Sequence, residues 1–388
     1  MTAPVVAVVG GGQLARMMAS PAAALGVHLR VLVESPTSSA AQVVVDAPVG
    51  AASDEAAIAR LVEGADALTF EHEHVPNALL DRLEGAGVAV RPDAAALVHA
   101  QDKIVMRSRL AALGLPVPRW TALGSASDLA DFLGTVGGVA VVKTARGGYD
   151  GKGVRVVRSP DEVADWLAAA ADGSGAPLLA EEKVPFTREL AVLVARRPSG
   201  EARAWPVVES VQRDGVCAEV VAPAPGLHAA TEAEAIDVAT RIATGLGVTG
   251  VLAVELFEVE GADGGPPRVL VNELAMRPHN SGHWTIDGSV TSQFEQHLRA
   301  VLDLPLGDTS ARSAWTVMAN VLGSALPDPT AALGDVAVLD AGAKVHLYGK
   351  EVRAGRKLGH VNVSGEDLAD VRRRAVAAAA LLRGESSA

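Results

Sequence analysis

"VLAVELFEVEGADGGPPRVLVNELAM", residues 251–276, contains two apolar runs on either side of a turn rich in glycine and proline. This pattern predicts a β-hairpin. If the hairpin is symmetric about Gly264, Glu255 faces Glu273 directly, with about 5 Å between their Cβ atoms. In that register Glu255 shares a face with Val251, Ala253 and Phe257, and Glu273 shares a face with Val269 and Val271.

Two carboxylates on an apolar face repel each other unless a cation lies between them. Mg²⁺ supplies that charge and is usually held by one or two carboxylates plus substrate phosphates. The hairpin therefore predicts a metal site at Glu255 and Glu273 for Mg²⁺, or for Mn²⁺ in its place. The alternative is a shifted register that leaves both glutamates solvated or paired with Arg or Lys.

A second glycine-rich stretch, "TARGGYDGKG" (144–153), lies between the runs "VAVVK" and "VRVV". Its glycines allow several backbone N–H groups to point at phosphate oxygens, and Lys143, Arg146 and Lys152 would add positive charge. It is not a P-loop, because G-x-x-x-x-G-K-[ST] is absent. We expect a flap over a nucleotide. The alternative is a hairpin turn with solvated cations, although four glycines exceed what a two-residue turn needs.

The N-terminal segment predicts a strand, a glycine turn, a helix and a second strand. Gly10, Gly12 and Ala15 fit G-x-G-x-x-A, and Glu34 follows at about the spacing of a dinucleotide fingerprint. Taken alone, the pattern suggests an NAD site, and with it a dinucleotide-binding oxidoreductase, but a lone fingerprint of this kind is weak evidence. Two other interpretations stay open: small residues that let the helix pack closely on the sheet, and a helix N-terminus that binds a substrate phosphate.

Three polar segments follow predicted strands. "TFEHEHVP" (69–76) ends a buried strand, where substrate contact at the carboxyl edge of a sheet is favoured over a metal site. "MRPHNSGHWT" (276–285) follows the hairpin at once, and its Arg, His and Asn side chains can bind and orient a small polar reactant. "YGKEVRAGRKLGHVN" (348–362) indicates a pocket for an anionic substrate or, alternatively, a basic surface loop.

Composition excludes several classes of protein. The 388-residue chain carries a net charge of −12, so general nucleic-acid binding is not expected. No uncharged apolar stretch is long enough to span a bilayer, and the N-terminus lacks the basic region of a signal peptide. The single cysteine, Cys217, cannot form an internal disulfide, which fits a reducing cytoplasm.

Strands and helices alternate over residues 1–100, which predicts a parallel sheet covered by helices. From residue 138 short strands with one or two helices indicate an α+β module. We therefore expect a chain of α/β and α+β class with more than one domain.

In this order, the motifs "GGGQLARM", "TFEHEHV", "QDK", "VVKTARGGYDGKG", "EEKV", "NELAMRPHNSGHWT" and "YGKEVRAGRKLGH" resemble the ATP-grasp superfamily and, within it, the N5-carboxyaminoimidazole ribonucleotide synthases. The resemblance implies an ATP-grasp fold in three domains. These are a Rossmann-like N-terminal domain (1–100), an ATP-grasp domain (101–312) with a flap subdomain at about 120–185, and a small C-terminal domain (313–388). It also implies a homodimer.

The implied reaction converts ATP, bicarbonate and 5-aminoimidazole ribonucleotide to N5-carboxyaminoimidazole ribonucleotide, ADP and phosphate in purine biosynthesis. Other possibilities are a formate-using ribonucleotide transformylase of the same superfamily and a nucleotide-sensing module without turnover.

The resemblance also assigns residues. Those expected to bind ATP are Lys103, Lys143, Gly148, Tyr149, Asp150, Gly151, Lys152, Gly153, Val154, Glu181, Glu182, Lys183, Val184, Glu189, Gln212, Asn272 and Glu273. Those expected to bind the ribonucleotide are Gln13, Leu14, Glu73, Tyr149, Asp150, Lys152, Lys350, Arg353 and Arg356. Those expected to surround bicarbonate and carboxyphosphate as catalytic residues are Arg277, His279, Asn280 and Lys357.

Overall fold

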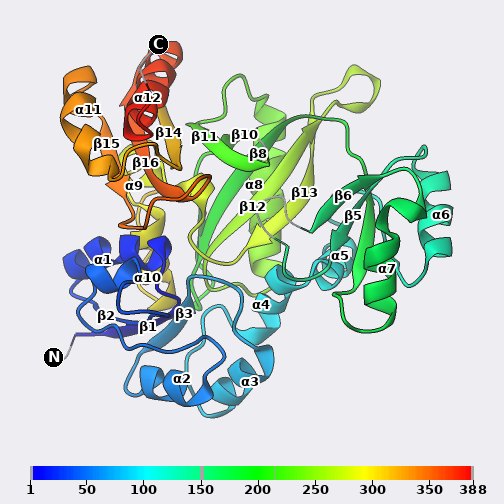
Figure 1. Ribbon diagram of the computed structural model, residues 1–388, viewed down its shortest axis with the longest axis horizontal. Coiled ribbons are helices and arrows are strands. Elements are labelled where there is room, and N and C mark those ends of the chain that lie inside the picture. Colours follow the sequence, from blue (N-terminus) through cyan, green and yellow to red (C-terminus); the bar gives the residue numbers. More distant parts are fainter. Residues whose placement is uncertain (1–2, 149–152, 214, 386–388) are drawn as a thin grey trace.

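The structure, a computed structural model, describes residues 3–148, 153–213 and 215–385. Figure 1 shows an N-terminal domain in blue, a small sheet at the opposite side, and a large sheet between them that runs on into the C-terminal segment. The combination of a parallel α/β sheet and an α+β part expected from the sequence is present in this arrangement. Among the described residues, no helix has the length and apolar character needed to cross a membrane.

The N-terminal domain contains the expected parallel sheet. Its strands are β1 (Val5–Val9), β2 (His28–Leu32) and β3 (Ala67–Phe70), in the order β2-β1-β3. The apolar residues at 88–90 add no full fourth strand, because only a single bridge joins Leu68 to Val90. Pro92 follows directly after Arg91 and has no N–H to continue the ladder. The helices of this region are α1 (Gln13–Leu25), α2 (Glu55–Val62), α3 (Asn77–Gly85) and α4 (Ala94–Gln101).

A helix and a small antiparallel sheet follow. Helix α5 (Lys103–Ala112) is capped by Asp102, whose side chain accepts hydrogen bonds from two N–H groups of the first turn. The sheet has the order β4-β7-β5-β6. Its elements are β4 (Trp120–Leu123), α6 (Ala126–Thr135), β5 (Ala140–Thr144), β6 (Val154–Val157), α7 (Ala164–Ala171) and β7 (Leu178–Glu182). The glycine-rich loop joins the paired strands β5 and β6.

The large sheet has the order β13-β12-β8-β10-β11-β14-β16-β15, with β9 paired to β8. Pairing of β11 with β14 carries this sheet across the expected domain boundary near residue 313. Its strands are β8 (Phe186–Arg196), β9 (Ala202–Ala204), β10 (Val208–Arg213), β11 (Val216–Ala222), β12 (Gly250–Val259), β13 (Arg268–Ala275), β14 (Trp315–Leu322), β15 (Lys344–Leu347) and β16 (Lys357–Gly365).

Helices cover the large sheet. Helix α8 contacts β8, β12 and β13, α10 contacts β8 and β12, and α12 contacts β14 and β16. Helix α1 also packs on α10, which joins the N-terminal domain to the rest. The remaining helices are α8 (Ala229–Gly245), α9 (Thr285–Gly288), α10 (Gln293–Val301), α11 (Leu333–Leu339) and α12 (Leu368–Leu382). Single 3-10 turns occur at Ala40–Gln42, Pro160–Val163, Ala262–Gly264, Asn280–Gly282 and Pro329–Ala332.

The β12–β13 hairpin confirms the predicted pairing of Glu255 with Glu273. A β-bulge directly after this pair places Leu256 opposite Val271, so Asn272 is the additional residue on β13. The predicted common face of Glu273 with Val269 and Val271 is therefore wrong. Both valines pack into a core on the other side of the sheet, together with Leu252, Val254 and Leu256. One extra residue reverses the alternation of side chains beyond it.

Candidate active site

Three carboxylates converge on neighbouring strands of the large sheet, Glu189 on β8, Glu255 on β12 and Glu273 on β13. Loss of solvation, together with the negative charges of Glu273 and Glu189, raises the pKa of Glu255 to about 8. Burial and Glu273 also raise the pKa of Glu189. Such mutual repulsion is relieved by a bound cation.

The oxygen donors of Glu255 and Glu273 suit Mg²⁺ or Mn²⁺. Within the described ranges, no group of three or more His, Cys, Asp and Glu side chains is placed to hold a metal ion. Mg²⁺ is usually held by one or two carboxylates together with substrate phosphates and water. The donor set present therefore fits a magnesium–nucleotide complex.

Two lysines lie beside the bulge of β13. Lys103 Nζ is 2.9 Å from Glu273 Oε1, and Lys143 Nζ donates to Asn272 Oδ1 at 3.2 Å. The start of α5 is held against the glycine-rich loop, because the Lys103 N–H donates to the Ala145 carbonyl. Two predicted phosphate ligands from different elements are thus brought to one place.

The described part of the glycine-rich loop requires glycine at two positions. Gly147 and Gly153 have φ values of 77° and 74°, which side chains rarely adopt. A Cβ at Gly153 would also lie 2.5 Å from Thr144 Oγ1. Gly148 belongs to the same described part, and Val154 begins β6 with an exposed side chain. The predicted ligands Tyr149, Asp150, Gly151 and Lys152 lie outside the described residues.

Glu181 is oriented differently from the ATP ligand that we expected. Its carboxylate is buried, and its two oxygens accept from Arg107 Nε at 2.6 Å and Lys143 Nζ at 2.8 Å. Burial alone would raise the pKa of Glu181, but these two cations hold it below its usual value. The carboxylate thus supports Lys143 instead of facing outward.

The three residues that follow Glu181, also expected to bind ATP, differ in exposure. Glu182 forms an ion pair with Arg119 at 2.8 Å, Lys183 is exposed and Val184 is buried. Gln212 on β10 lies beside Glu189 and partly offsets the rise in the pKa of that carboxylate, so two predicted nucleotide ligands from neighbouring strands lie together.

The loop after β13 faces the carboxylates. His279 Nε2 is 3.3 Å from Glu255 Oε1. The Ser281 N–H donates to His279 Nδ1 at 3.4 Å, so the ring proton is on Nε2, directed at Glu255. Burial, with the positive charges of Arg277 and Lys357, lowers the pKa of His279 to about 3. The imidazole is therefore neutral and can donate one hydrogen bond.

Other members of this loop reach neighbouring segments. Arg277 Nε is 2.9 Å from Glu73 Oε1, which links the N-terminal domain to the loop. Neither amide atom of buried Asn280 has a hydrogen-bond partner among the residues that the structure describes. Lys357 lowers the pKa of Glu255 as well as that of His279, so its charge acts on the same site. An unpartnered buried amide is a group that a polar ligand would satisfy.

The predicted ribonucleotide ligands come from opposite ends of the chain. Lys350 Nζ donates to Gln13 Oε1, and Gln42 Nε2 donates to the Gly349 carbonyl at 2.7 Å. Arg353 is exposed and forms an ion pair with the Glu351 carboxylate. Arg356 donates to the main-chain carbonyl of Glu351. The Leu14 side chain is buried in the core of the N-terminal domain, so only its main chain is left to face a substrate.

The first glycine turn is occupied by a carboxylate. The Gly12 N–H donates to Glu71 Oε2, and burial raises the pKa of Glu71. In a dinucleotide site this helix N-terminus would face a pyrophosphate. Glu71 occupies the place that a pyrophosphate would take in such a site, which argues against the NAD interpretation.

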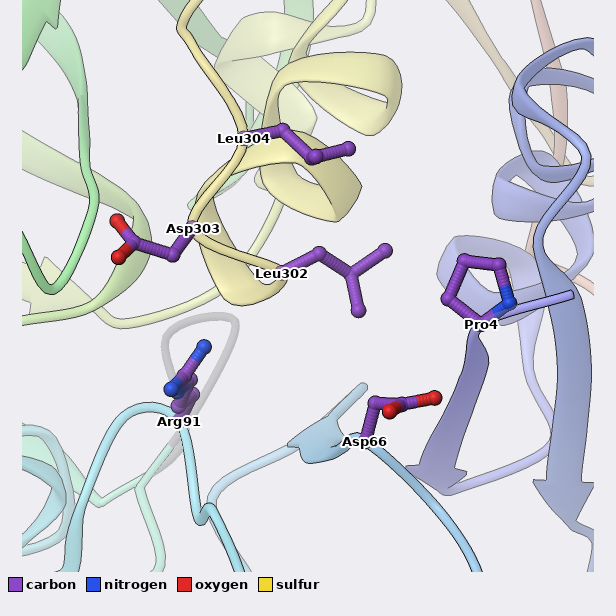
Figure 2. A pocket seen from close by; sticks show the side chains of 6 residues that line it. All are labelled: Pro4, Asp66, Arg91, Leu302, Asp303 and Leu304. Carbon is purple, nitrogen blue, oxygen red and sulfur yellow. The ribbon is translucent and has the colours of Figure 1, made fainter. Parts of the chain in front are cut away.

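Figure 2 shows a pocket elsewhere, between the N-terminal sheet and the end of α10. It has a volume of about 300 Å³ and is lined by Pro4, Asp66, Arg91, Leu302, Asp303 and Leu304. None of the predicted site residues lines it, so it is separate from the carboxylate site.

Several residues of the site were not predicted, among them Arg107, Gln293 and Ser281. Gln293 accepts from the His279 N–H and donates to the His279 carbonyl, both at 2.8 Å. Arg107 and Gln293 are of residue types that are common on helices, and only their contacts with residues distant in the sequence distinguish them from surface residues.

Domain families match nearly the whole chain. Residues 3–101 match the ribonucleotide synthetase preATP-grasp domain, 108–294 the ATP-grasp domain and 316–374 the phosphoribosylaminoimidazole carboxylase C-terminal domain.

The chain is 54% identical over 380 residues to N5-carboxyaminoimidazole ribonucleotide synthase from Mycobacterium tuberculosis, covering 97% of this chain and 87% of the relative. The solved structure of the Thermus thermophilus synthetase matches with a TM-score of 0.85 and 38% identity, covering 98% and 99% of the two chains. An Aspergillus clavatus synthase in complex with ADP and 5-aminoimidazole ribonucleotide matches with a TM-score of 0.86 and 30% identity, covering 98% and 99%. The chain belongs to the N5-carboxyaminoimidazole ribonucleotide synthase family.

Proposed function

We propose that this chain catalyses the ATP-dependent carboxylation of 5-aminoimidazole ribonucleotide by bicarbonate, releasing ADP and phosphate. The observation that carries the assignment of residues is the opposed pair Glu255 and Glu273, with Lys103 at 2.9 Å from Glu273 and His279 at 3.3 Å from Glu255. This arrangement supports the proposal of a metal–phosphate site next to groups that can hold a small anion. We also propose that the protein is a cytoplasmic homodimer.

In the first step a bicarbonate oxygen attacks the γ-phosphorus of ATP, the bond to the β-phosphate oxygen breaks, and carboxyphosphate and ADP form. Mg²⁺ bound by Glu255 and Glu273 would supply charge neutralisation at the phosphates. Lys103 and Lys143 would add fixed positive charge there. Arg277, His279, Asn280 and Lys357 would hold the bicarbonate, because they offer several N–H donors around one small volume.

In the second step the exocyclic amine of the ribonucleotide attacks the carbonyl carbon of carboxyphosphate. The carbon–oxygen bond to phosphate breaks, and the nitrogen loses a proton. Gln13 and Lys350, in contact across the two ends of the chain, would hold the ribonucleotide with Glu73, Arg353 and Arg356. The glycine-rich flap would exclude water, because carboxyphosphate hydrolyses readily.

The test is ADP release measured while the amine and the acid are varied separately. Release that requires both 5-aminoimidazole ribonucleotide and bicarbonate is expected. A requirement for formate would assign a transformylase instead, and binding of ATP without hydrolysis would assign a nucleotide-sensing module. Either result would overturn the proposal.

A further inference from the structure

A completely buried arginine lies behind the carboxylate site. Arg107, on α5, has no exposed side-chain surface. Its guanidinium donates from Nε to Glu181 Oε1 at 2.6 Å, from Nη1 to the Val271 carbonyl at 2.8 Å, and from Nη2 to the Asn272 carbonyl at 2.7 Å. A buried charge is tolerated only with such complete pairing.

The two carbonyls that Arg107 binds belong to the β-bulge of β13. A bulge interrupts the ladder and leaves backbone groups without strand partners. The planar guanidinium satisfies two neighbouring carbonyls at once. It therefore holds the bulge in the shape that presents the Asn272 side chain to Lys143 and places Glu273 opposite Glu255.

The same guanidinium also acts on the small sheet. Glu181, on β7, uses one oxygen for Arg107 and the other for Lys143 on β5. Arg107 is thus bonded to both sheets, and Figure 1 shows α5 lying between the small sheet and β13. The positions of Lys143 and Glu273 are coupled through one side chain that reaches neither of them directly.

We infer that Arg107 is a positioning residue for the magnesium–nucleotide site, acting through the β13 bulge and through Glu181. This inference rests on the proposed function, since it assumes that Lys143, Asn272 and Glu273 bind the phosphates and the metal. It goes beyond that function by assigning the geometry of those groups to a residue that touches neither nucleotide nor metal.

The test compares Arg107→Lys and Arg107→Met with Arg109→Lys and Arg109→Met. Arg109 is a matched control on the same helix, where it donates to the Gly245 carbonyl. The measurements are the thermal unfolding midpoint and the calorimetric dissociation constant of ADP with and without Mg²⁺. Lys keeps the charge of Arg107 but cannot bind two carbonyls and a carboxylate with one planar group.

We expect Arg107→Lys to stay folded and to weaken magnesium-dependent ADP binding by roughly 10–100-fold, as loss of an outer partner of a metal site does. The KM values for bicarbonate and the ribonucleotide should change little, and the Arg109 variants should bind ADP as the wild type does. Unchanged ADP binding by folded Arg107→Lys would overturn the inference. Failure of both Arg107 variants to fold would also overturn it, because Arg107 would then be a folding residue.

Measuring ADP binding distinguishes a failure of this inference from a failure of the proposed function. Wild-type protein that binds ADP and Mg²⁺ without turning over the ribonucleotide would reject the proposed reaction. The effect of Arg107 on ADP binding would still be measurable in that protein.

Discussion

Lys103 Nζ and Glu273 Oε1 lie 2.9 Å apart, joining the first residue of α5 to the bulged strand β13. The Glu273 side chain is 41% exposed, so this ion pair contributes little to folding stability. Its position matters for another reason. A lysine and a carboxylate that neutralise each other in the free protein become ligands for a phosphate and a metal when a nucleotide binds.

Replacement of Glu273 by Gln should therefore abolish turnover while the protein still folds. The amide loses the charge that holds Mg²⁺, and we expect kcat to fall by at least about a hundredfold. Steady-state ADP release and thermal unfolding measure the two effects. Glu260→Gln is the control, because Glu260 is an exposed residue just beyond β12. Full activity of Glu273→Gln would contradict the metal assignment.

Removal of divalent cations should stop ADP release, and added Mg²⁺ or Mn²⁺ should restore it. Without the metal, the nucleotide phosphates would face Glu189, Glu255 and Glu273 and be repelled. ADP should therefore raise the unfolding midpoint with Mg²⁺ present and much less with a chelator. Equal stabilisation by ADP under both conditions would show that the carboxylates bind no nucleotide-linked metal.

Gly12→Ala should destabilise the N-terminal domain and weaken binding of the ribonucleotide. A Cβ at Gly12 would lie 2.0 Å from Glu71 Oε1, and relief requires a shift of Glu71 or of the turn before Gln13. Overpacking of this kind costs about 1–3 kcal/mol. Urea unfolding and the KM for 5-aminoimidazole ribonucleotide are the measurements.

The matched control for Gly12→Ala is Gly85→Ala. Gly85 lies in α3, and a Cβ there meets nothing within 4 Å, so this variant should be no less stable than the wild type. Equal stabilities and equal KM values of the two variants would mean that the contact between Gly12 and Glu71 affects neither folding nor binding of the ribonucleotide.

Gln293→Leu should impair the use of bicarbonate. The change leaves the buried N–H and carbonyl of His279 without the partners that fix the loop, at a cost of about 1–3 kcal/mol. We expect a higher KM for bicarbonate and a lower kcat. Gln296→Leu removes an equally buried glutamine of α10 that bonds Gly307 instead, so it should lower stability without raising the KM for bicarbonate. The same KM change in both variants would contradict a specific role of Gln293.

The amino-acid sequence alone was sufficient to predict the β-hairpin of the site and the parallel sheet of the N-terminal domain. Alternating apolar residues on either side of the turn at 261–267 predicted the hairpin and the pairing of Glu255 with Glu273. The alternation of strands and helices predicted the parallel N-terminal sheet. These features depend on residues that are close together along the chain, and their spacing can be read from the sequence.

Contacts between distant segments set the remaining features. The bulge at Asn272 turns Val269 and Val271 to the other face of the sheet. Arg107 donates hydrogen bonds to the carbonyls of Val271 and Asn272 there, although it precedes them by 164 and 165 residues in the sequence. Glu181 faces inward because two cations from other elements meet its carboxylate. Local periodicity cannot predict such choices, because the energy of a buried charge depends on which partners the folded chain brings to it.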